Sequence, residues 1–253
     1  MTAPIALQLY SVRENLASDF VGVMERIAEI GYVGVEPIFR LPGTTMPQAA
    51  RLFSELGLQV PSVHVPLPLG EDRSRVLDVM AAFGSKRIVS GKGPDSFETV
   101  QLIERTCDLF NEACAVAAGN GMLFGIHNHW WEFQQVEGRY VYQVMLDCLD
   151  PAIFFEVDTY WVQTAGLDPA TVLEELGRRA VLLHIKDGPA VKDEPQVAVG
   201  EGLLDFPSIV QAAGGTAEWL IVELDDCATP MLGAVEKSYR YLVGEGLAHG
   251  NKG

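Results

Sequence analysis

The sequence predicts a single (β/α)8 barrel, an α/β fold of the TIM-barrel type, that spans residues 1–253 as one domain. Short apolar runs alternate with amphipathic segments along the whole chain, and eight such pairs follow one another at intervals of about 32 residues. The length of 253 residues is close to the usual size of this architecture, about 250 residues. No long Pro/Gly/Ser-rich linker divides the chain, so we expect no domain boundary.

The predicted strands are apolar on both faces, which is typical of parallel strands that are covered by helices. Each is joined to the next segment by a short connection, and eight repeats favour a closed barrel over an open sheet. The predicted strands are residues 5–9, 33–35, 59–63, 87–90, 122–126, 153–157, 181–185 and 219–222.

Each predicted strand is followed by a segment with helical periodicity. In the first of these, Val23 and Ile27 share one face, and Gly31 ends the helix. The helix after the sixth strand opens with Asp168 as N-cap and Pro169 as its first residue. The predicted helices are residues 19–30, 46–56, 73–83, 96–118, 140–149, one that starts at 169, 206–213 and 231–243.

Composition excludes several classes of function. With 48% hydrophobic and 21% charged residues, the chain can bury a large core. Its formal net charge of −16 disfavours binding to nucleic-acid backbones and anionic membranes. No apolar run reaches the roughly 18 residues of a membrane span, and the opening MTAPIALQLYSV has neither a basic lead nor a cleavage site. We therefore expect a cytoplasmic protein with no nucleic-acid or membrane partner.

Two other features carry no functional assignment. The cysteines, Cys107, Cys114, Cys148 and Cys227, are scattered among apolar neighbours and are expected to be reduced thiols. The stretch GKG at 91–93 lacks the spacing of a P-loop or a dinucleotide-binding loop, so it does not predict a phosphate site.

Six of the eight predicted strands end at or beside an ionisable residue. In a parallel barrel these ends meet at one mouth, where enzymes of this architecture carry their chemistry. Each residue alone is compatible with a hydrogen bond at the rim. Burying carboxylates beside a histidine, however, is costly without a cation, so the set predicts an active site that contains a metal ion. The six residues are Glu36, His64, His127, Asp158, His184 and Glu223.

The segment LFGIHNHWWEF at 123–133 concentrates groups that bind metals or move protons. His127, His129 and Glu132 fall within six positions of a chain that has five histidines. Two histidines with hydrogen bonds at a strand end, beside core tryptophans, remain an alternative interpretation. Carboxylates together with imidazoles suit a divalent transition metal, and we expect manganese first, with zinc or cobalt as alternatives.

Seven motifs, spread over nearly the whole chain, carry a resemblance to a known family. They are LQLYSVRE at 7–14, EIGYVGVE at 29–36, HNHWWEF at 127–133, FEVDTYWVQTAGLDP at 155–169, VLLHIKD at 181–187, GEGLLDF at 200–206 and IVELD at 221–225. Together they resemble the sugar phosphate isomerase/epimerase group of the xylose isomerase-like barrel superfamily. They do not specify a substrate.

The resemblance implies that Asp158, His184 and Glu223 are metal ligands, with a fourth ligand at the end of the fifth strand. Most characterised members have a glutamate there, which forms an acid/base pair with the glutamate of the eighth strand. This chain has His127 at that position, with His129 on the same side of an extended backbone. Either histidine is a candidate fourth ligand, and relatives resembling inosose dehydratase carry a similar histidine cluster.

The reaction implied by the resemblance is isomerisation or epimerisation of a sugar, a sugar phosphate or a keto-sugar. A metal polarises a carbonyl, and a side chain removes a proton from the adjacent carbon to give an enediolate. Glu223 is the expected acid/base group, with His129 or Glu132 as its counterpart. Loss of a β-oxygen from the same enediolate would make the protein a lyase or dehydratase that acts on a keto-sugar or keto-inositol.

The sugar or polyol substrate is expected to contact side chains around this mouth. Lys186 shares a face with His184 and is suited to hold a substrate oxygen, although a solvated rim lysine is the alternative. The tryptophans are either a sugar platform or part of the core wall. The candidate substrate-binding residues are Glu36, His64, Lys186, Trp130 and Trp161.

Two other functional classes remain as alternatives. A non-catalytic sugar-binding barrel would need the same polar mouth without a metal, so metal analysis discriminates it. The superfamily also contains DNA repair endonucleases with three zinc ions, but those use more than five histidines and a basic surface. The substrate, the metal and the oligomeric state stay open, and a homo-oligomer is compatible with the sequence.

Overall fold

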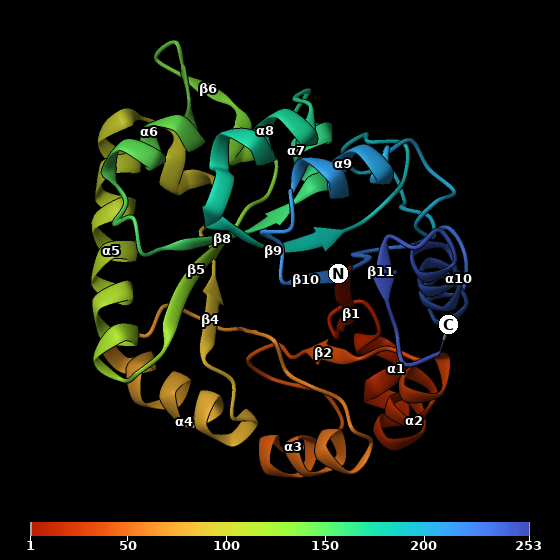
Figure 1. Ribbon diagram of the computed structural model, residues 1–253. Helices are drawn as coiled ribbons and strands as arrows, with labels where there is room; N and C mark the ends of the chain where they lie inside the picture. Colours follow the sequence, from red (N-terminus) through yellow and green to blue (C-terminus); the bar gives the residue numbers. More distant parts are fainter. Residues whose placement is uncertain (1, 253) are drawn as a thin grey trace.

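The computed structural model describes residues 2–252 and contains eight parallel strands that form a nearly closed barrel (Figure 1). The strands pair in the order β2, β1, β10, β9, β8, β5, β4, β3, and isolated bridges from Gly34 to Gln59 and from Ile38 to His64 join β2 to β3. The predicted (β/α)8 barrel is confirmed. The barrel strands are β1 (Ala3–Gln8), β2 (Gly34–Glu36), β3 (Val63–His64), β4 (Arg87–Ser90), β5 (Leu123–His127), β8 (Phe154–Asp158), β9 (Ala180–Ile185) and β10 (Trp219–Val222).

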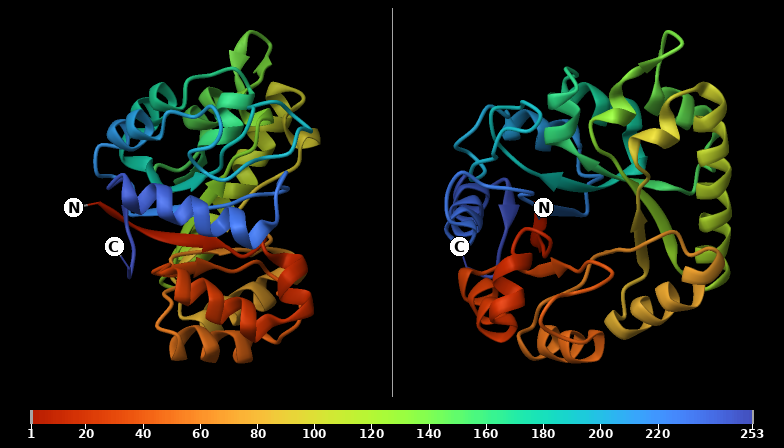
Figure 2. Two further views of the ribbon diagram at one scale, coloured as in Figure 1. Left: turned by 90° about the vertical axis from the view of Figure 1, so that its right-hand side faces the viewer. Right: turned by 180° about the vertical axis from the view of Figure 1, so that it is seen from behind.

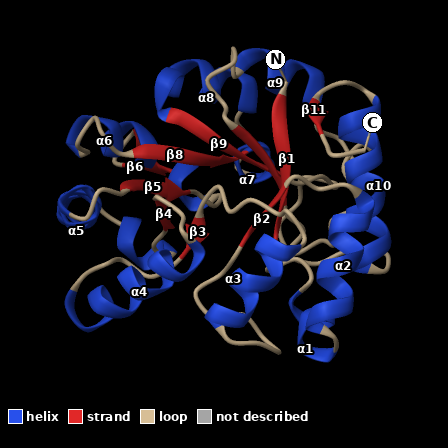
Figure 3. Ribbon diagram, turned by 60° about the horizontal axis from the view of Figure 1, so that its bottom comes forward, coloured by secondary structure: helices blue, strands red, loops and turns tan. Residues whose placement is uncertain are grey.

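Helices cover the outside of the barrel on all sides (Figure 3). The predicted helices are all present, and their ends shift by only a few residues. The helices are α1 (Arg13–Ser18), α2 (Phe20–Ile30), α3 (Met46–Glu55), α4 (Arg73–Phe83), α5 (Val100–Gly119), α6 (Val141–Cys148), α7 (Thr159–Thr164), α8 (Pro169–Leu176), α9 (Phe206–Ala212) and α10 (Met231–Gly244). None of these described helices combines the length and apolar character needed to cross a membrane.

Several short elements were not predicted from the sequence. They include α1, α7, the hairpin of β6 (Gln135–Val136) with β7 (Arg139–Tyr140), and β11 (Ala248–His249). The predicted third strand, 59–63, is reduced to Val63–His64, with Gln59 joined only by an isolated bridge. Pro61 lies between them, and proline has no N–H to continue a strand ladder.

The first and last described segments of the chain lie together at the amino-terminal end of the barrel strands. The last strand, β11, pairs with the start of β1 through Ala3 and Ala248. The side view in Figure 2 shows the two termini at the same end of the molecule.

A small apolar cluster fills the barrel interior near the amino-terminal ends of the strands. Within it the Phe154 ring lies against Gly125 of the neighbouring strand, where a Cβ atom would come within 2.2 Å of that ring. Glycine at 125 therefore allows the ring to enter the barrel. The polar side chains lie above this cluster, towards the carboxyl ends of the strands. The cluster comprises Ala6, Val33, Val89, Phe154, Leu182, Trp219 and Ile221.

The long connection from β9 to α9 folds around the buried carboxylate of Asp187. This carboxylate accepts backbone N–H groups from Gly188, Gly200 and Gly202, each at 2.9 Å, and from Leu204 at 3.3 Å. Buried N–H groups need such partners, because leaving one unpaired costs about 1–3 kcal/mol. One side chain thus holds the loop at the rim of the barrel.

The segment after β5 is anchored by a second buried carboxylate, that of Glu132. Its Oε2 accepts the His129 N–H at 2.9 Å, while Oε1 has no hydrogen-bond partner among the described residues. The side chain is 1% exposed and lies beside apolar residues that include Phe133 and Tyr142. Burial raises the pKa of Glu132 to about 8.

We predict that Asp187→Ala destabilises the protein by about 3 kcal/mol or more, because several buried N–H groups lose their acceptor at once. Chemical denaturation measures this loss, and limited proteolysis should cut the loop faster. Glu194→Ala, at an exposed position of the same loop, is the matched control. Equal stability of the Asp187 and Glu194 variants would contradict this role of Asp187.

A second prediction concerns pH. The Glu132 carboxyl has a folded-state pKa of about 8 against an ordinary value of 4.5, so unfolding releases its proton between these values. Its contribution to stability therefore falls as the pH rises through this range, by up to about 1.4 kcal/mol per pH unit. Glu132→Gln removes this dependence.

Urea denaturation of wild type and Glu132→Gln at several values between pH 5 and pH 8 measures the difference. The variant should gain stability relative to wild type as the pH rises. Glu112→Gln, at an exposed position of α5, should follow the wild type. Parallel curves for wild type and Glu132→Gln would show that the Glu132 carboxyl does not carry the shifted pKa.

Candidate active site

A cavity of about 440 Å3 opens at the carboxyl ends of the barrel strands. Its size is in the range of sites for small organic ligands. It lies at the mouth where the sequence predicted a site. The lining residues are Gln8, Tyr10, Ile38, His64, Gly91, Lys92, Gly93, His127, His129, Trp131, Lys186, Glu223 and Asp225.

Strand register places the ionisable side chains next to one another. His127 of β5 is the partner of Glu156 in β8, and Asp158 of β8 is the partner of His184 in β9. Adjacent partners in parallel strands point to the same face, and so do residues two apart in one strand. A register shift between Phe155 and Glu156 sets the pairing of β8 with β9.

One group of four buried side chains has the composition of a metal site, and we call it the upper group. It consists of His127, Asp158, His184 and Glu223, whose facing atoms all lie within 4.8 Å of one another. His184 Nδ1 lies 2.8 Å from Glu223 Oε2, and His127 Nε2 lies 3.9 Å from Asp158 Oδ2. His127 belongs to this group, whereas His129 does not.

The Lys186 ammonium lies among the carboxylates of this mouth. Its Nζ is 2.9 Å from Asp158 Oδ2, 2.8 Å from Glu223 Oε2 and 2.6 Å from Asp225 Oδ2. Burial acts to lower the pKa of Lys186, but the three carboxylates raise it well above its ordinary value. The side chain is 1% exposed, so Lys186 is a buried cation and not a solvated rim residue.

The Lys186 ammonium also acts to lower the pKa values of the carboxylates beside it. Burial raises the pKa of Asp158 to about 6, even though Lys186 and His184 oppose that rise. Burial would likewise raise the pKa of Glu223, but the charges of Lys186 and His184 hold it well below its ordinary value. Glu223 is therefore ionised at neutral pH.

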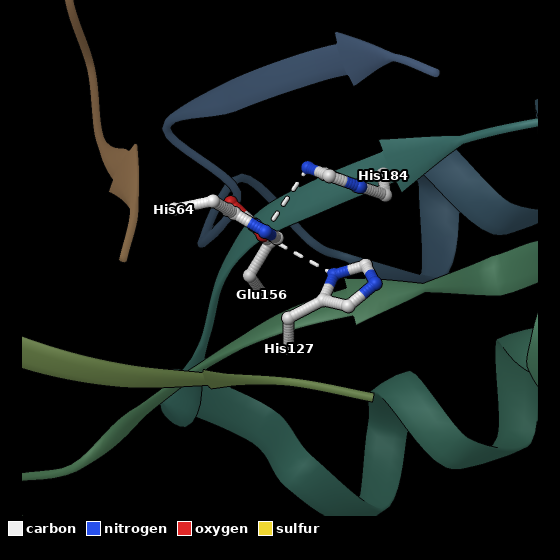
Figure 4. A group of neighbouring side chains, drawn as sticks. All are labelled: His64, His127, Glu156 and His184. Carbon is white, nitrogen blue, oxygen red and sulfur yellow. Dashed lines mark hydrogen bonds and ion pairs between the residues drawn. The ribbon is translucent and has the colours of Figure 1, made fainter. Parts of the chain in front are cut away.

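A second group of four side chains lies next to the upper group, and we call it the lower group. It consists of His64, His127, Glu156 and His184, and Figure 4 shows the Glu156 carboxylate between the three imidazole rings. Glu156 Oε2 lies 3.2 Å from His127 Nδ1 and 3.1 Å from His184 Nε2, and it also contacts His64 Nε2. His184 Nε2 is in addition 2.8 Å from Glu36 Oε2.

The ionisable side chains in and beside the lower group shift one another's pKa values. Burial and the nearby Glu156 raise the pKa of Glu36. Burial acts against ionisation of Glu156 too, but the charges of His184 and His64 lower its pKa well below the ordinary value. Burial and the charge of His184 lower the pKa of His127 well below its ordinary value, so this ring is neutral.

The remaining residues of the HNHWWEF motif have separate positions. The His129 ring lines the cavity and stacks on Trp131, with 4.2 Å between ring centroids. Burial, with the charge of Lys186, lowers the pKa of His129 to about 3. Trp130 instead contacts Lys192, and the Glu132 carboxylate does not line the cavity.

Trp161, the other predicted substrate contact, is partly buried beside Tyr160 and 5.4 Å from the Lys186 ammonium, measured to its ring centroid. It does not line the cavity. Among the tryptophan rings of the motif, Trp131 lines the cavity. Its Nε1 donates to the Lys92 carbonyl at 3.0 Å, which holds the ring in place.

Sequence reasoning missed Glu156, Gln8 and Asp225 as site residues. Two of them lie two positions from a predicted site residue: Glu156 comes before Asp158, and Asp225 comes after Glu223. The period of two in a strand was the available signal for both. Gln8 ends β1 and donates from Nε2 to Glu36 Oε2 at 2.7 Å.

The donor atoms of the upper group fit a divalent transition metal. Two imidazoles and two carboxylates are a common set for such ions. The Asp158 Oδ2 and Glu223 Oε2 atoms of this group lie 2.9 and 2.8 Å from the Lys186 ammonium, so the two carboxylates already face a cation in the structure.

Three solved structures illustrate what the fold resembles. A sugar phosphate isomerase/epimerase from Parabacteroides distasonis is 25% identical with a TM-score of 0.84, and the match covers 98% of this chain and 96% of the other. The probable 3-DHS dehydratase AsbF from Bacillus anthracis is 14% identical (TM-score 0.75; 95% and 98% covered). L-ribulose 3-epimerase is 15% identical (TM-score 0.72; 97% and 94% covered).

The comparison of sequences gives one match at the level of a family. No curated protein sequence matches the chain significantly. The family model described as xylose isomerase-like TIM barrel matches residues 24–242, which is most of the chain. With the barrel and its polar mouth already described, this match identifies the chain as a member of the xylose isomerase-like TIM barrel family.

Proposed function

We propose that this protein is a divalent-metal-dependent isomerase or epimerase that acts on a sugar, a sugar phosphate or a keto-sugar. The observation that carries the proposal is that Glu223 and His129 line one cavity beside a group of four metal-type ligands. The names of two structural neighbours, a sugar phosphate isomerase/epimerase and L-ribulose 3-epimerase, support the class of reaction.

The upper group, His127, Asp158, His184 and Glu223, would hold the ion. We propose manganese first, with zinc or cobalt as alternatives. Bound there, the ion would supply a Lewis acid for a substrate carbonyl. Lys186 competes for the same Asp158 and Glu223 oxygens, so in the loaded protein it would keep its contact with Asp225 and donate to a substrate oxygen.

Glu223 and His129 are the proposed proton carriers. Glu223 is ionised and lines the cavity, so its carboxylate can accept a proton from a carbon next to a carbonyl. His129 is neutral, and stacking on Trp131 fixes the plane of its ring. Glu132, the other predicted counterpart, would act only by fixing the His129 backbone, since its carboxylate accepts that N–H.

The substrate would contact His64, Lys186 and Trp131 along the cavity wall. Glu36 lies behind the wall, against His184, and is proposed to orient that ring. Trp130 and Trp161 would contribute at the periphery, where they face Lys192 and Lys186.

Elimination is the second candidate reaction. Its support is that β5 ends in His127 where relatives with a two-glutamate mechanism have a carboxylate, together with the fold shared with a probable 3-DHS dehydratase. In both reactions Glu223 or His129 first removes a proton next to a carbonyl. They differ in whether the enediolate regains a proton or loses a β-oxygen.

The proposal predicts that manganese-loaded protein in deuterated water places deuterium on one carbon of a keto-sugar or ketose. Glu223→Gln should lower this exchange by a factor on the order of 100 or more, the usual scale for loss of a general acid or base. Metal content is measured beside the rate, because Glu223 is also a proposed ligand. Glu104→Gln, at an exposed position of α5, is the control.

Mass spectrometry of the products separates the two reactions. Incorporation without any other mass change indicates an isomerase or epimerase. Loss of water or of a larger β-substituent indicates the lyase. If metal binds but no keto-sugar or ketose exchanges a proton, the proposed reaction is wrong and a non-catalytic sugar-binding barrel replaces it.

A further inference from the structure

We propose that the lower group, His64, His127, Glu156 and His184, is a second metal-binding site that selects zinc and other imidazole-preferring ions. We further propose that zinc at this site excludes a metal from the upper group by taking over the two shared histidines. Neither statement depends on which reaction the protein catalyses.

The lower group has the shape of a ligand set. Its four facing atoms lie within 4.8 Å of one another. The three imidazole rings are mutually adjacent, with centroid distances of 4.9 Å for His64 and His127, 5.3 Å for His64 and His184, and 4.6 Å for His127 and His184. Zinc bonds to nitrogen and oxygen are about 2.0–2.2 Å long. Glu156 Oε2 contacts His64 Nε2 and lies 3.2 and 3.1 Å from the nitrogens of His127 and His184, so an ion would take the space between the rings as the carboxylate moves outward to become a ligand.

An unpartnered buried atom points into this group. His127 Nδ1 is buried and has no hydrogen-bond partner within residues 2–252, although it faces Glu156 Oε2 at 3.2 Å. The His127 side chain is 6% exposed, so water does not readily replace the missing partner. Bonding to an ion between His127 and Glu156 would satisfy this nitrogen.

The two groups use opposite nitrogens of the shared rings. His127 turns Nδ1 to the lower group and Nε2 to the upper, while His184 turns Nε2 to the lower group and Nδ1 to the upper. A neutral imidazole has one lone pair for a metal. One ring therefore serves one ion at a time, which makes occupation of the two groups mutually exclusive.

The two groups offer different ligand types and therefore favour different metal ions. The lower group offers three imidazoles and one carboxylate, a set that suits zinc, whereas the upper group offers two of each and suits manganese better. The Lys186 ammonium contacts Asp158 and Glu223 of the upper group, and no ion pair joins it to Glu156 of the lower group within the described residues. Glu36 and Glu156 together balance the charge of a divalent ion in the lower group.

An entry path exists for the ion. His64 is the most exposed ligand of the lower group, at 22% of its side chain, and lines the cavity with His127. An ion that enters the cavity can therefore reach the His64 ring, which belongs to the lower group alone.

The test is calorimetric titration of zinc chloride, and separately of manganese chloride, into the metal-free full-length chain. His64→Gln and Glu156→Gln change only the lower group, while Asp158→Asn and Glu223→Gln change only the upper. His249→Gln is the matched control, because that histidine is exposed on β11 and its Nδ1 contacts the Thr2 carbonyl.

We expect one zinc ion per chain in the wild type. His64→Gln and Glu156→Gln should weaken zinc at least about tenfold while changing manganese by less than about threefold, and Asp158→Asn should do the reverse. Preloading with zinc should abolish manganese binding, which electron paramagnetic resonance measures. The inference is overturned if zinc binding is lost in Asp158→Asn and kept in His64→Gln, or if both metals bind together.

X-ray absorption of the zinc-loaded wild type gives a test that needs no variant. Three imidazole rings around zinc support the lower group. Two rings with two carboxylates would assign zinc to the upper group and overturn the inference, even if the His64 and Glu156 variants fail to fold.

Discussion

Four carboxylates, those of Glu36, Glu156, Asp158 and Glu223, lie inside the barrel with side chains that are 7% exposed or less. Burial of a charge is costly unless a charge of opposite sign lies close by. In this structure the positive charge comes from the Lys186 ammonium and from the His184 imidazole, whose pKa burial acts to lower but the neighbouring carboxylates raise well above its ordinary value. The rest of the site follows from this balance, because any ligand or ion that enters must replace part of it.

The backbone makes this concentration of charge possible. The apolar cluster fills the barrel near the amino-terminal ends of the strands, so polar side chains lie near the carboxyl ends. The register of β5, β8 and β9 sets those side chains next to one another. Asp158 also caps α7 by accepting the Trp161 N–H at 3.0 Å, which leaves Oδ2 to face Lys186. The same residue therefore ends a strand, begins a helix and supplies a potential ligand oxygen.

The alternation of apolar runs and helices was enough to predict the barrel, and the strand ends were enough to predict the mouth. The sequence alone could not show which side chains point into the barrel or which groups they contact there. Glu156 lies inside β8, and only the register of the strands shows that its carboxylate reaches three histidines. Trp131 lines the cavity in place of the predicted Trp130, and it stacks on the His129 ring there. On an extended backbone Trp131 would share a side with His127 and His129, so the period of two was a signal for Trp131. Lys186 contacts carboxylates from two other strand ends, and pairings between strands cannot be read from one segment alone.

The central claim is that the buried carboxylates require a cation, which Lys186 provides and a divalent metal can replace. Thermal unfolding of Lys186→Met with and without manganese tests this claim most directly, with Lys237→Met, which removes an exposed ion pair with Glu201, as control. Loss of one member of a buried ionic cluster costs about 3–5 kcal/mol, so the metal-free variant should melt roughly 10 °C below wild type, and manganese should restore most of that loss. A metal-free variant as stable as the wild type, or one that manganese fails to stabilise, would contradict the claim.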